Sequence, residues 1–280
     1  MHLRLLLALF FVAGTDSNAF AGDAAVTLRF MRDGQAPRTI DLATLTAHCA
    51  VTTVALDDPH YLTRKSFRAC PLGEVLAFGF GESVAALRGQ IVVFRARDGY
   101  AKPADGALLG EPGGFLAFAD ADHMHGDDPG WQPIARTRTD PGPFYLVWTG
   151  PQQDSTRYPW PYQLTEIEIT PPEGFYPHIA PITAAPDSPA YAGYVIFKSQ
   201  CIACHAINSE GGTVGPDLNI PQSIVEYRPA DQIKAYVHNP LTFRYTSMPP
   251  NSQLSDRQLD DLIAYFNAMK TLKYDPHRRP

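Results

Sequence analysis

Residues 201–205 read Cys201-Ile202-Ala203-Cys204-His205, and this stretch decides the fold of the chain around it. In a Cys-x-x-Cys-His sequence the two thiols form thioether bonds to the vinyl groups of a haem, and the histidine is a ligand of its iron. A thioredoxin-like redox pair shares the Cys-x-x-Cys spacing, but it needs a βαβ setting, whereas the residues around this motif have helical spacing. The motif therefore predicts one covalently bound haem c.

Helical patterns lie on both sides of this motif. Ser188-Pro189 is a helix cap with a first-turn proline, and Tyr191, Tyr194, Val195 and Ile196 follow at helical spacing. Residues 255–258 form a capping box, and apolar residues follow it at i, i+3, i+4 and i+7: Leu259, Leu262, Ile263 and Phe266. A weaker helical stretch, 230–238, ends before Pro240. These patterns predict an all-α domain.

From about residue 187 onward the chain resembles class I cytochrome c. Besides the haem motif, the resemblance rests on Gly193, Phe197, Tyr265, the run 215–218 (Gly-Pro-Asp-Leu) and the run 247–250 (Ser-Met-Pro-Pro). It implies that Gly193 lets the first helix cross closely under Tyr265. It also implies that the carbonyl of Pro216 accepts a hydrogen bond from His205, which fixes the orientation of the ring and raises its basicity.

Met248 is the candidate sixth ligand of the iron, since no other methionine lies between the haem motif and the last helix. The alternative role for Met248 is a core thioether that fills a gap, and the alternative ligands are His238 and Met269. With histidine and methionine as axial ligands, the reduction potential is high and the iron is closed to exogenous ligands. This ligand set indicates an electron carrier.

Upstream of residue 171, short apolar runs alternate with Gly, Pro and Asp turns, which predicts a mainly β, α+β domain. The predicted strands are 26–30, 51–56, 91–96, 115–119, 144–148 and 162–169, and the predicted helices are 42–47 and 72–78. Closely spaced prolines after residue 170 indicate an extended linker. The expected organisation is a signal peptide (1–21), the α+β domain (22–170), the linker (171–187) and the cytochrome domain (188–280).

Residues 25–170 resemble the molybdopterin-binding domain of the sulfite oxidase-like family. The resemblance rests on the stretches 41–45, 51–53, 66–72, 98–100, 142–147 and 162–168. Catalytic members have a molybdenum-ligating cysteine just after the strand at 51–53, where this chain reads Val54-Ala55-Leu56-Asp57-Asp58. An arginine-rich pterin pocket is not evident either. The resemblance therefore implies a fold, and neither molybdenum nor molybdopterin is expected.

Cys49 and Cys70 are the two cysteines outside the haem motif. If the strands around 51–56 and 66–69 pair about a turn near Pro59-His60, positions whose numbers sum to 119 face each other, and Cys49 and Cys70 form such a pair. In an oxidising compartment a disulfide is the preferred interpretation. Two free buried thiols, or a metal-binding or redox-active pair, are the alternatives.

The stretch 120–128 gathers His123, Met124, His125 and four carboxylates. Imidazole and thioether ligands suit copper, and a His-x-His pair can converge on one ion from an extended backbone. His123 and His125 are therefore a candidate second metal site, for copper or zinc. A solvated acidic loop is the alternative.

Residues 1–21 have the order of a secretory signal peptide, with Arg4, an apolar run over 5–13 and the pattern Ala19-Phe20-Ala21. Cleavage after Ala21 and a periplasmic location are expected; a membrane anchor or a buried N-terminal helix is the alternative. No later stretch reaches the roughly 18 apolar residues that would span a bilayer. The formal charge of −6 provides no basic surface for nucleic acid, so a nucleic-acid partner is not expected.

Together these features predict a periplasmic electron-transfer protein whose partner is a dehydrogenase or a terminal oxidase, with the N-terminal domain as a docking or scaffolding module. Whether the chain is also an enzyme stays open. One alternative is an oxidoreductase whose N-terminal domain binds a metal or a small substrate and passes electrons to the haem. Another is a haem-based sensor or a metal-delivery protein. No nucleotide-binding or hydrolase motif occurs in the sequence.

Overall fold

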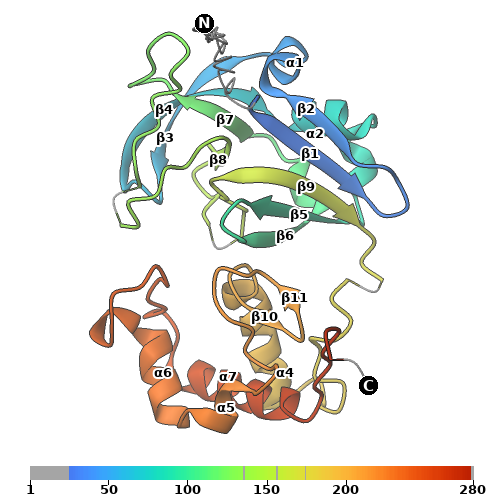
Figure 1. The fold of residues 1–280 in the computed structure, drawn as a ribbon, viewed down its shortest axis with the longest axis vertical. Helices are drawn as coiled ribbons and strands as arrows, with labels where there is room; N and C mark the ends of the chain where they lie inside the picture. The colour runs from blue at the N-terminus through green and yellow to red at the C-terminus, as the bar shows by residue number, and fades with distance from the viewer. Residues whose placement is uncertain (1–24, 135, 156, 174, 279–280) are drawn as a thin grey trace, which may run out of the picture.

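A computed structural model describes residues 25–134, 136–155, 157–173 and 175–278. The signal peptide expected at 1–21 lies outside these residues. The described chain forms two lobes that stack on each other (Figure 1). The first, from β1 to β9, is rich in strands; the second, from α4 to α7, is helical.

The first sheet of the β-rich lobe has five strands in the order β2-β1-β9-β5-β6. They span Thr27–Arg32 (β1), Arg38–Asp41 (β2), Ile91–Ala96 (β5), Ala101–Asp105 (β6) and Leu164–Thr170 (β9). Strand β9 pairs parallel with β1 and antiparallel with β5, so the last strand of the lobe lies in the middle of its sheet. The side chains of Leu164, Ile167 and Ile169 on β9 are buried, which favours this central position.

The second sheet has four antiparallel strands in the order β3-β4-β7-β8. They span Thr52–Asp58 (β3), Thr63–Pro71 (β4), Gly114–Asp120 (β7) and Tyr145–Trp148 (β8). One apolar core joins both sheets with α1 (Leu42–Ala47), α2 (Leu72–Phe80), α3 (Gly106–Leu109) and the 3-10 turn η1 (Val84–Leu87). The six predicted strands and the two predicted helices are confirmed, with ends that differ by at most two residues.

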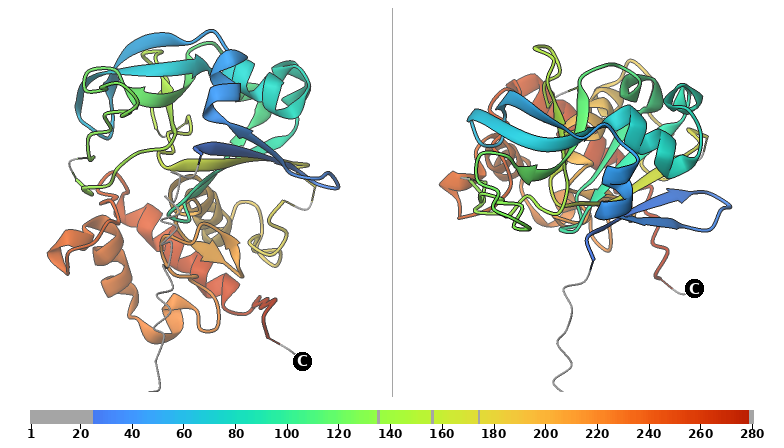
Figure 2. Two further views of the ribbon diagram at one scale, coloured as in Figure 1. Left: turned by 45° about the horizontal axis from the view of Figure 1, so that its top comes forward. Right: turned by 90° about the horizontal axis from the view of Figure 1, so that it is seen from above.

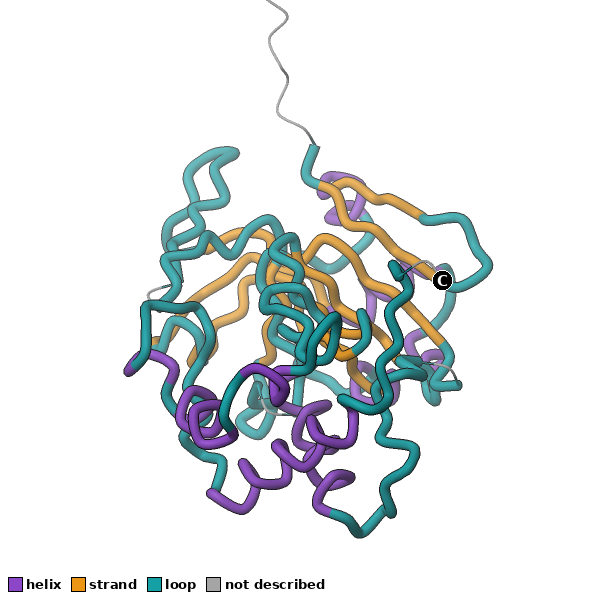
Figure 3. Tube along the Cα trace, turned by 60° about the horizontal axis from the view of Figure 1, so that its bottom comes forward, coloured by secondary structure: helices purple, strands orange, loops and turns teal. Residues whose placement is uncertain are grey.

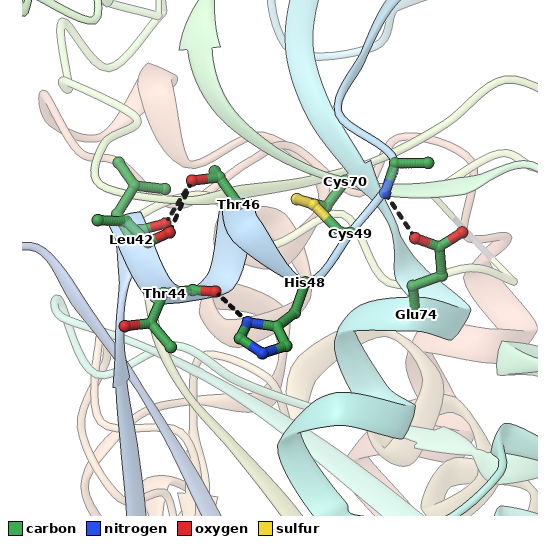
Figure 4. Close-up of a disulfide and its surroundings, with 9 residues drawn as sticks. Leu42, Thr44, Thr46, His48, Cys49, Cys70 and Glu74 are labelled. Atoms are coloured by element: carbon green, nitrogen blue, oxygen red, sulfur yellow. Dashed lines mark hydrogen bonds between the residues drawn. A yellow bond between two sulfur atoms is a disulfide. The ribbon is translucent and has the colours of Figure 1, made fainter.

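Cys49 and Cys70 form the expected disulfide, with their Cα atoms 5.6 Å apart (Figure 4). The predicted strand register, however, is wrong. Thr52 pairs with Ala69 and Asp58 pairs with Thr63, so facing positions sum to 121. The turn is centred one residue later than predicted because Asp58 accepts hydrogen bonds from the backbone N–H groups of His60 and Tyr61 and so closes the loop. The bridge therefore lies just outside the β3–β4 ladder and ties the end of α1 to β4.

Replacing both Cys49 and Cys70 by alanine is expected to lower the free energy of unfolding of the β-rich lobe by about 3 kcal/mol, because the bridge closes a loop of 21 residues in the unfolded chain. All three tryptophans precede residue 171, so their fluorescence during guanidinium unfolding reports on this lobe. Reductant should lower the stability of the wild type to that of the variant and leave the variant unchanged. An unchanged unfolding midpoint in the variant would contradict the prediction.

The helical lobe contains α4 (Pro189–Ile196), α5 (Ile224–Tyr227), α6 (Ala230–His238), α7 (Asp256–Met269), the 3-10 turn η3 (Pro240–Thr242) and a small ladder of β10 (Ala206–Ile207) with β11 (Glu210–Gly211). Its helices gather at one end of the molecule and the strands of the other lobe at the opposite end (Figure 3). As the sequence predicts, Ser188 caps α4 and a capping box of Ser255 and Gln258 begins α7.

Helices α4 and α7 cross in close contact at Gly193. A Cβ atom at Gly193 would lie 2.0 Å from the carbonyl oxygen of Asp261 and 2.8 Å from Cβ of Tyr265. Both obstacles belong to a helix that cannot move away without losing its own packing. The crossing therefore requires glycine, as the resemblance to cytochrome c implies.

The second half of the proline-rich stretch is attached to the helical lobe. Ile179 is buried in the core of that lobe, and its carbonyl oxygen accepts a hydrogen bond of 2.8 Å from the hydroxyl of Tyr265. The ring of His178 stacks on Tyr274, with centroids 3.7 Å apart, and its Nδ1 lies 2.6 Å from a carboxylate oxygen of Glu210. Contacts with the helical core are therefore already made at Tyr176, six residues after the end of β9.

Gly193→Ala is expected to destabilise the helical lobe by about 3 kcal/mol or more, because the added methyl group meets backbone atoms that have no room to shift. The matched control is Gly73→Ala in α2, where the nearest atom to the added Cβ is Val84 Cγ1 at 4.0 Å. That change should be neutral or slightly stabilising. Thermal unfolding followed by haem absorbance reports on the first variant and tryptophan fluorescence on the second. Equal transition temperatures for wild type and Gly193→Ala would contradict the prediction.

Candidate functional site

The haem motif follows a wide helical turn at the end of α4. Residues Phe197–Cys201 form a π-helical turn, η2, and the N–H of Ile202 donates to the carbonyl of Phe197 at 3.0 Å. The side chains of Phe197 and Ile202 are buried in the core of the helical lobe. Anchored by these two side chains, the chain presents Cys201, Cys204 and His205 to one cavity.

A second segment, 212–215, runs beside the motif and holds its main chain. The N–H of Gly212 donates to the carbonyl of Ile202, and the N–H of Gly215 donates to the carbonyl of Cys204, both at 2.8 Å. A Cβ at Gly212 would lie 2.0 Å from the carbonyl oxygen of Ala203. The close approach of the two segments therefore depends on glycine at this position.

The ring of His205 is held in one orientation. Its Nδ1 lies 2.8 Å from the carbonyl oxygen of Pro216, the contact that the resemblance to cytochrome c implies. Since a carbonyl only accepts, Nδ1 carries the proton and Nε2 keeps a free lone pair for a metal. Burial lowers the pKa of His205, although the hydrogen bond to Pro216 opposes this shift, so the ring is neutral at pH 7. Gly215 leaves room for the ring, because a Cβ there would lie 2.2 Å from its Cε1.

A cavity of about 620 Å³ is lined by Cys201, Cys204, His205 and Met248. Of the three candidate sixth ligands, Met248 lines the cavity, whereas Met269 is fully buried in the core and His238 is exposed. The remaining lining is mostly apolar and includes Val214, Leu218, Ile224, Ile233, Val237, Phe243, Leu262 and Phe266. The size of the cavity and its donors fit a haem attached through two cysteines, with a histidine and a methionine available as axial ligands.

The two cysteines of the motif are free of disulfide bonds. Burial raises the pKa of the Cys201 thiol to about 12 and that of the Cys204 thiol to about 11. Both sulfur atoms are therefore protonated thiols at neutral pH in the chain without its cofactor. They remain available for thioether bonds to haem vinyl groups.

Arg228 and Arg244 are the arginines of the cavity lining, and among the described residues that form this lining there is no Asp or Glu. The guanidinium of Arg228 lies over the ring of Tyr227, 6.0 Å from its centroid, and Nε of Arg244 donates to the hydroxyl of Tyr236 at 3.1 Å. The two cations would hold the carboxylate groups of a haem. When bound, the haem supplies reversible one-electron chemistry at its iron.

The β-rich lobe reaches this site through the turn between β5 and β6. The N–H of Ala101 donates to the carbonyl of Ala203 at 2.9 Å, and the N–H of Thr213 donates to the carbonyl of Gly99 at 2.8 Å. Gly99 has φ +94°, and a Cβ there would lie 2.3 Å from Oγ1 of Thr213. Figure 2 shows from two further directions that the β-rich lobe covers one end of the helical lobe. The haem motif is thus held between its own lobe and the other one.

Two further contacts join the lobes near the cavity. Nζ of Lys102 donates to the carbonyl of Ser199 at 3.2 Å, and the guanidinium of Arg136 donates to the carbonyl of Ser247 at 3.0 Å. Sequence reasoning identified residues 98–100 as a turn but gave no indication of what it meets. It missed Lys102 and Arg136 altogether, because neither lies in a motif and both contacts join residues about 100 positions apart.

The geometry described above defines a haem-binding domain of the cytochrome c type. Residues 190–270 match the family model of cytochrome c. The helical lobe is therefore a cytochrome c domain, which implies covalently bound haem c and a role in electron transfer. A search of the curated proteins finds no match to the chain.

The candidate second metal site at His123 and His125 gains no support from the structure. Nδ1 of His123 lies 3.2 Å from a carboxylate oxygen of Asp120, which also pairs with Lys65, and the backbone of His125 pairs with that of Asp128. Within the part of the chain that the structure describes, no group of three or more His, Cys, Asp or Glu side chains is arranged to hold a metal ion.

Met248→Ala is expected to open the iron of the matured protein to exogenous ligands, because it removes the one candidate sixth ligand that lines the cavity. Carbon monoxide should then bind the reduced variant rapidly at neutral pH, while the wild type binds it slowly. Met269→Leu, a core change of similar volume, serves as the control and should behave like the wild type. If only the Met269 variant bound carbon monoxide rapidly, Met269 and not Met248 would be the sixth ligand.

Proposed function

We propose that this protein is an exported c-type cytochrome that exchanges single electrons with a periplasmic redox partner, a dehydrogenase or a terminal oxidase. The observation that carries the proposal is the cavity lined together by Cys201, Cys204, His205 and Met248. A haem held there would take both axial ligands, His205 and Met248, from side chains, and would leave no position open for oxygen, peroxide or a substrate. This arrangement suits an electron carrier better than an enzyme.

The residues around the cavity fix the orientation of His205 and exclude water. The carbonyl of Pro216 fixes His205 through Nδ1 and makes its Nε2 a stronger donor. Apolar side chains such as Leu218 and Phe266 keep water from the cavity. A dry apolar surrounding together with a thioether ligand favours the ferrous state, so we expect a high reduction potential.

For the β-rich lobe we propose a docking role, which rests on the distribution of charge. Residues 22–187 contain 13 Lys and Arg against 20 Asp and Glu, whereas residues 188–280 contain nine against eight. The acidic excess therefore belongs to the N-terminal part, where it would attract a partner with a positive face at low ionic strength. The order of its elements supports a sulfite oxidase-like fold for residues 25–170, and a fold alone carries no activity.

The proposed periplasmic location is supported by the signal-peptide pattern at 1–21 and by the disulfide between Cys49 and Cys70, a bond that persists in oxidising compartments. A cytochrome c domain fits the same compartment. None of the helices that the structure describes has both the length and the apolar character needed to cross a membrane.

Stopped-flow mixing with a small basic redox protein tests the proposed function. The matured, haem-loaded protein should exchange one electron per haem, and the second-order rate should fall about tenfold or more between about 10 mM and about 0.5 M salt, because the attraction is electrostatic. Reduction by neutral hydroquinone is the control and should change little with salt. Absence of electron exchange would contradict the carrier role, whereas exchange without salt dependence would contradict the docking role of the acidic lobe.

A further inference from the structure

The segment 245–250, which carries Met248, has few hydrogen bonds within its own lobe. Among the described residues, each of these bonds joins residues two positions apart in the sequence. The backbone N–H of Met248 donates to Oγ1 of Thr246 at 3.2 Å, and the side-chain Nδ2 of Asn251 donates to the carbonyl of Pro249 at 3.3 Å. Pro249 and Pro250 have no N–H to donate. Tyr245 is fully exposed. The helical lobe holds the two ends of the segment, through the N–H of Arg244, which donates to the carbonyl of Pro240 at 3.2 Å, and the N–H of Asn251, which donates to the carbonyl of Val237 at 3.1 Å. Between these ends, the described residues show no hydrogen bond from the helices of that lobe to the main chain around Met248.

The one hydrogen bond that ties this segment to a distant part of the described chain comes from the other lobe. The guanidinium of Arg136 donates to the carbonyl oxygen of Ser247 at 3.0 Å, one residue before Met248. A charged donor makes a stronger hydrogen bond than a neutral one.

The loop that carries Arg136 is itself anchored. Ile134 is buried, its backbone pairs with that of Thr139, and its carbonyl accepts a hydrogen bond of 2.7 Å from the N–H of Arg138. The same lobe is fixed to the other side of the cavity, where Gly99 and Ala101 bond to the main chain beside the haem motif. The β-rich lobe therefore contacts both the segment that carries the haem motif and the segment that carries Met248.

We propose that Arg136 is a positioning residue for Met248: by holding the carbonyl of Ser247, the β-rich lobe keeps the methionine at the iron. The inference rests on the proposed function, since it requires Met248 to be the axial ligand. It assigns to the N-terminal lobe a role inside its own chain, in addition to any contact with a partner. Loss of Arg136 shifts the segment toward open states, and loss of its positive charge also removes a stabilisation of the ferrous over the ferric iron.

The experiment measures carbon monoxide binding to the reduced, haem-loaded full-length protein. Because binding requires the methionine to be off the iron, the rate is proportional to the fraction of open molecules. Loss of one charge-assisted hydrogen bond at an exposed site is expected to raise that rate about three- to tenfold in Arg136→Ala. Arg136→Lys keeps a charged donor, so its rate should stay below about half that of the alanine variant.

Arg88→Ala is the matched control. Arg88 is an exposed arginine that follows η1, near the ends of β5 and β6 opposite the turn that bonds to the haem motif. Its loss changes the net charge by the same amount and should leave the rate unchanged. A second readout is the reduction potential, which should move to a more negative value in Arg136→Ala and not in Arg88→Ala. The charge-transfer band of methionine-ligated ferric haem should weaken in the first variant alone.

An Arg136→Ala protein that binds carbon monoxide at the wild-type rate would overturn the inference, as would equal effects of the alanine variants at 136 and 88, or equal rates for alanine and lysine at 136. Met248→Ala, measured alongside, distinguishes failure of the Met248 ligand assignment from failure of the positioning role of Arg136. If it binds no faster than the wild type, the ligand assignment of the proposed function fails together with the inference. If it binds rapidly while Arg136→Ala does not, the inference alone fails.

Discussion

The relation between Cys201, Cys204 and His205 is the constraint on which the rest of the structure depends. A covalently attached haem with one histidine ligand needs these three side chains on one wall of one cavity, and the chain meets this need by fixing the main chain of the motif. Phe197 and Ile202 anchor it from the core, the segment 212–215 bonds to it along one side, and the turn at Gly99 bonds to it from the other lobe. The close approach of these segments leaves no room for a Cβ atom, so glycine stands at 99, where a Cβ would meet the side chain of Thr213, and at 212, where it would meet the main chain of Ala203.

A close contact that requires glycine also occurs further from the site, at the crossing of α4 and α7. Helix α4 delivers the chain to the motif, so its position decides where the cysteines lie. That position is set by the absence of a side chain at Gly193 and by the burial of Tyr265 against it. The hydroxyl of Tyr265 in turn bonds to the carbonyl of Ile179, which attaches the incoming chain to the same crossing. One close helix contact therefore organises the entry to the lobe, the haem motif and the last helix together.

Local patterns predicted most of the elements and the core of the site, because caps, spacing and turn residues act over a few positions. The caps at Ser188 and Ser255 and the motif at 201–205 are of this kind. The predicted β3–β4 register was wrong, because the numbers of facing residues sum to 121 and not to 119. The register depends on the Asp58 carboxylate, which closes the turn between the two strands, and no apolar pattern indicates that hydrogen bond. The place of β9 between β1 and β5, and the contact of Arg136 with Ser247, depend on packing between distant segments and leave no local trace.

The effect of the hydrogen bonds between the lobes follows from how the lobes are joined. Among the described residues, four such bonds, from Ala101, Lys102, Thr213 and Arg136, link the two lobes around the haem motif and the methionine segment. Between separate molecules such a set would bind weakly, since each bond replaces a bond to water. Here β9 ends at Thr170 and the chain is already fixed to the helical core at Ile179, so the connection is short and the effective concentration of one lobe at the other is high. A single exposed arginine can therefore act on the methionine side of the cavity, because the rest of the chain has already brought it there.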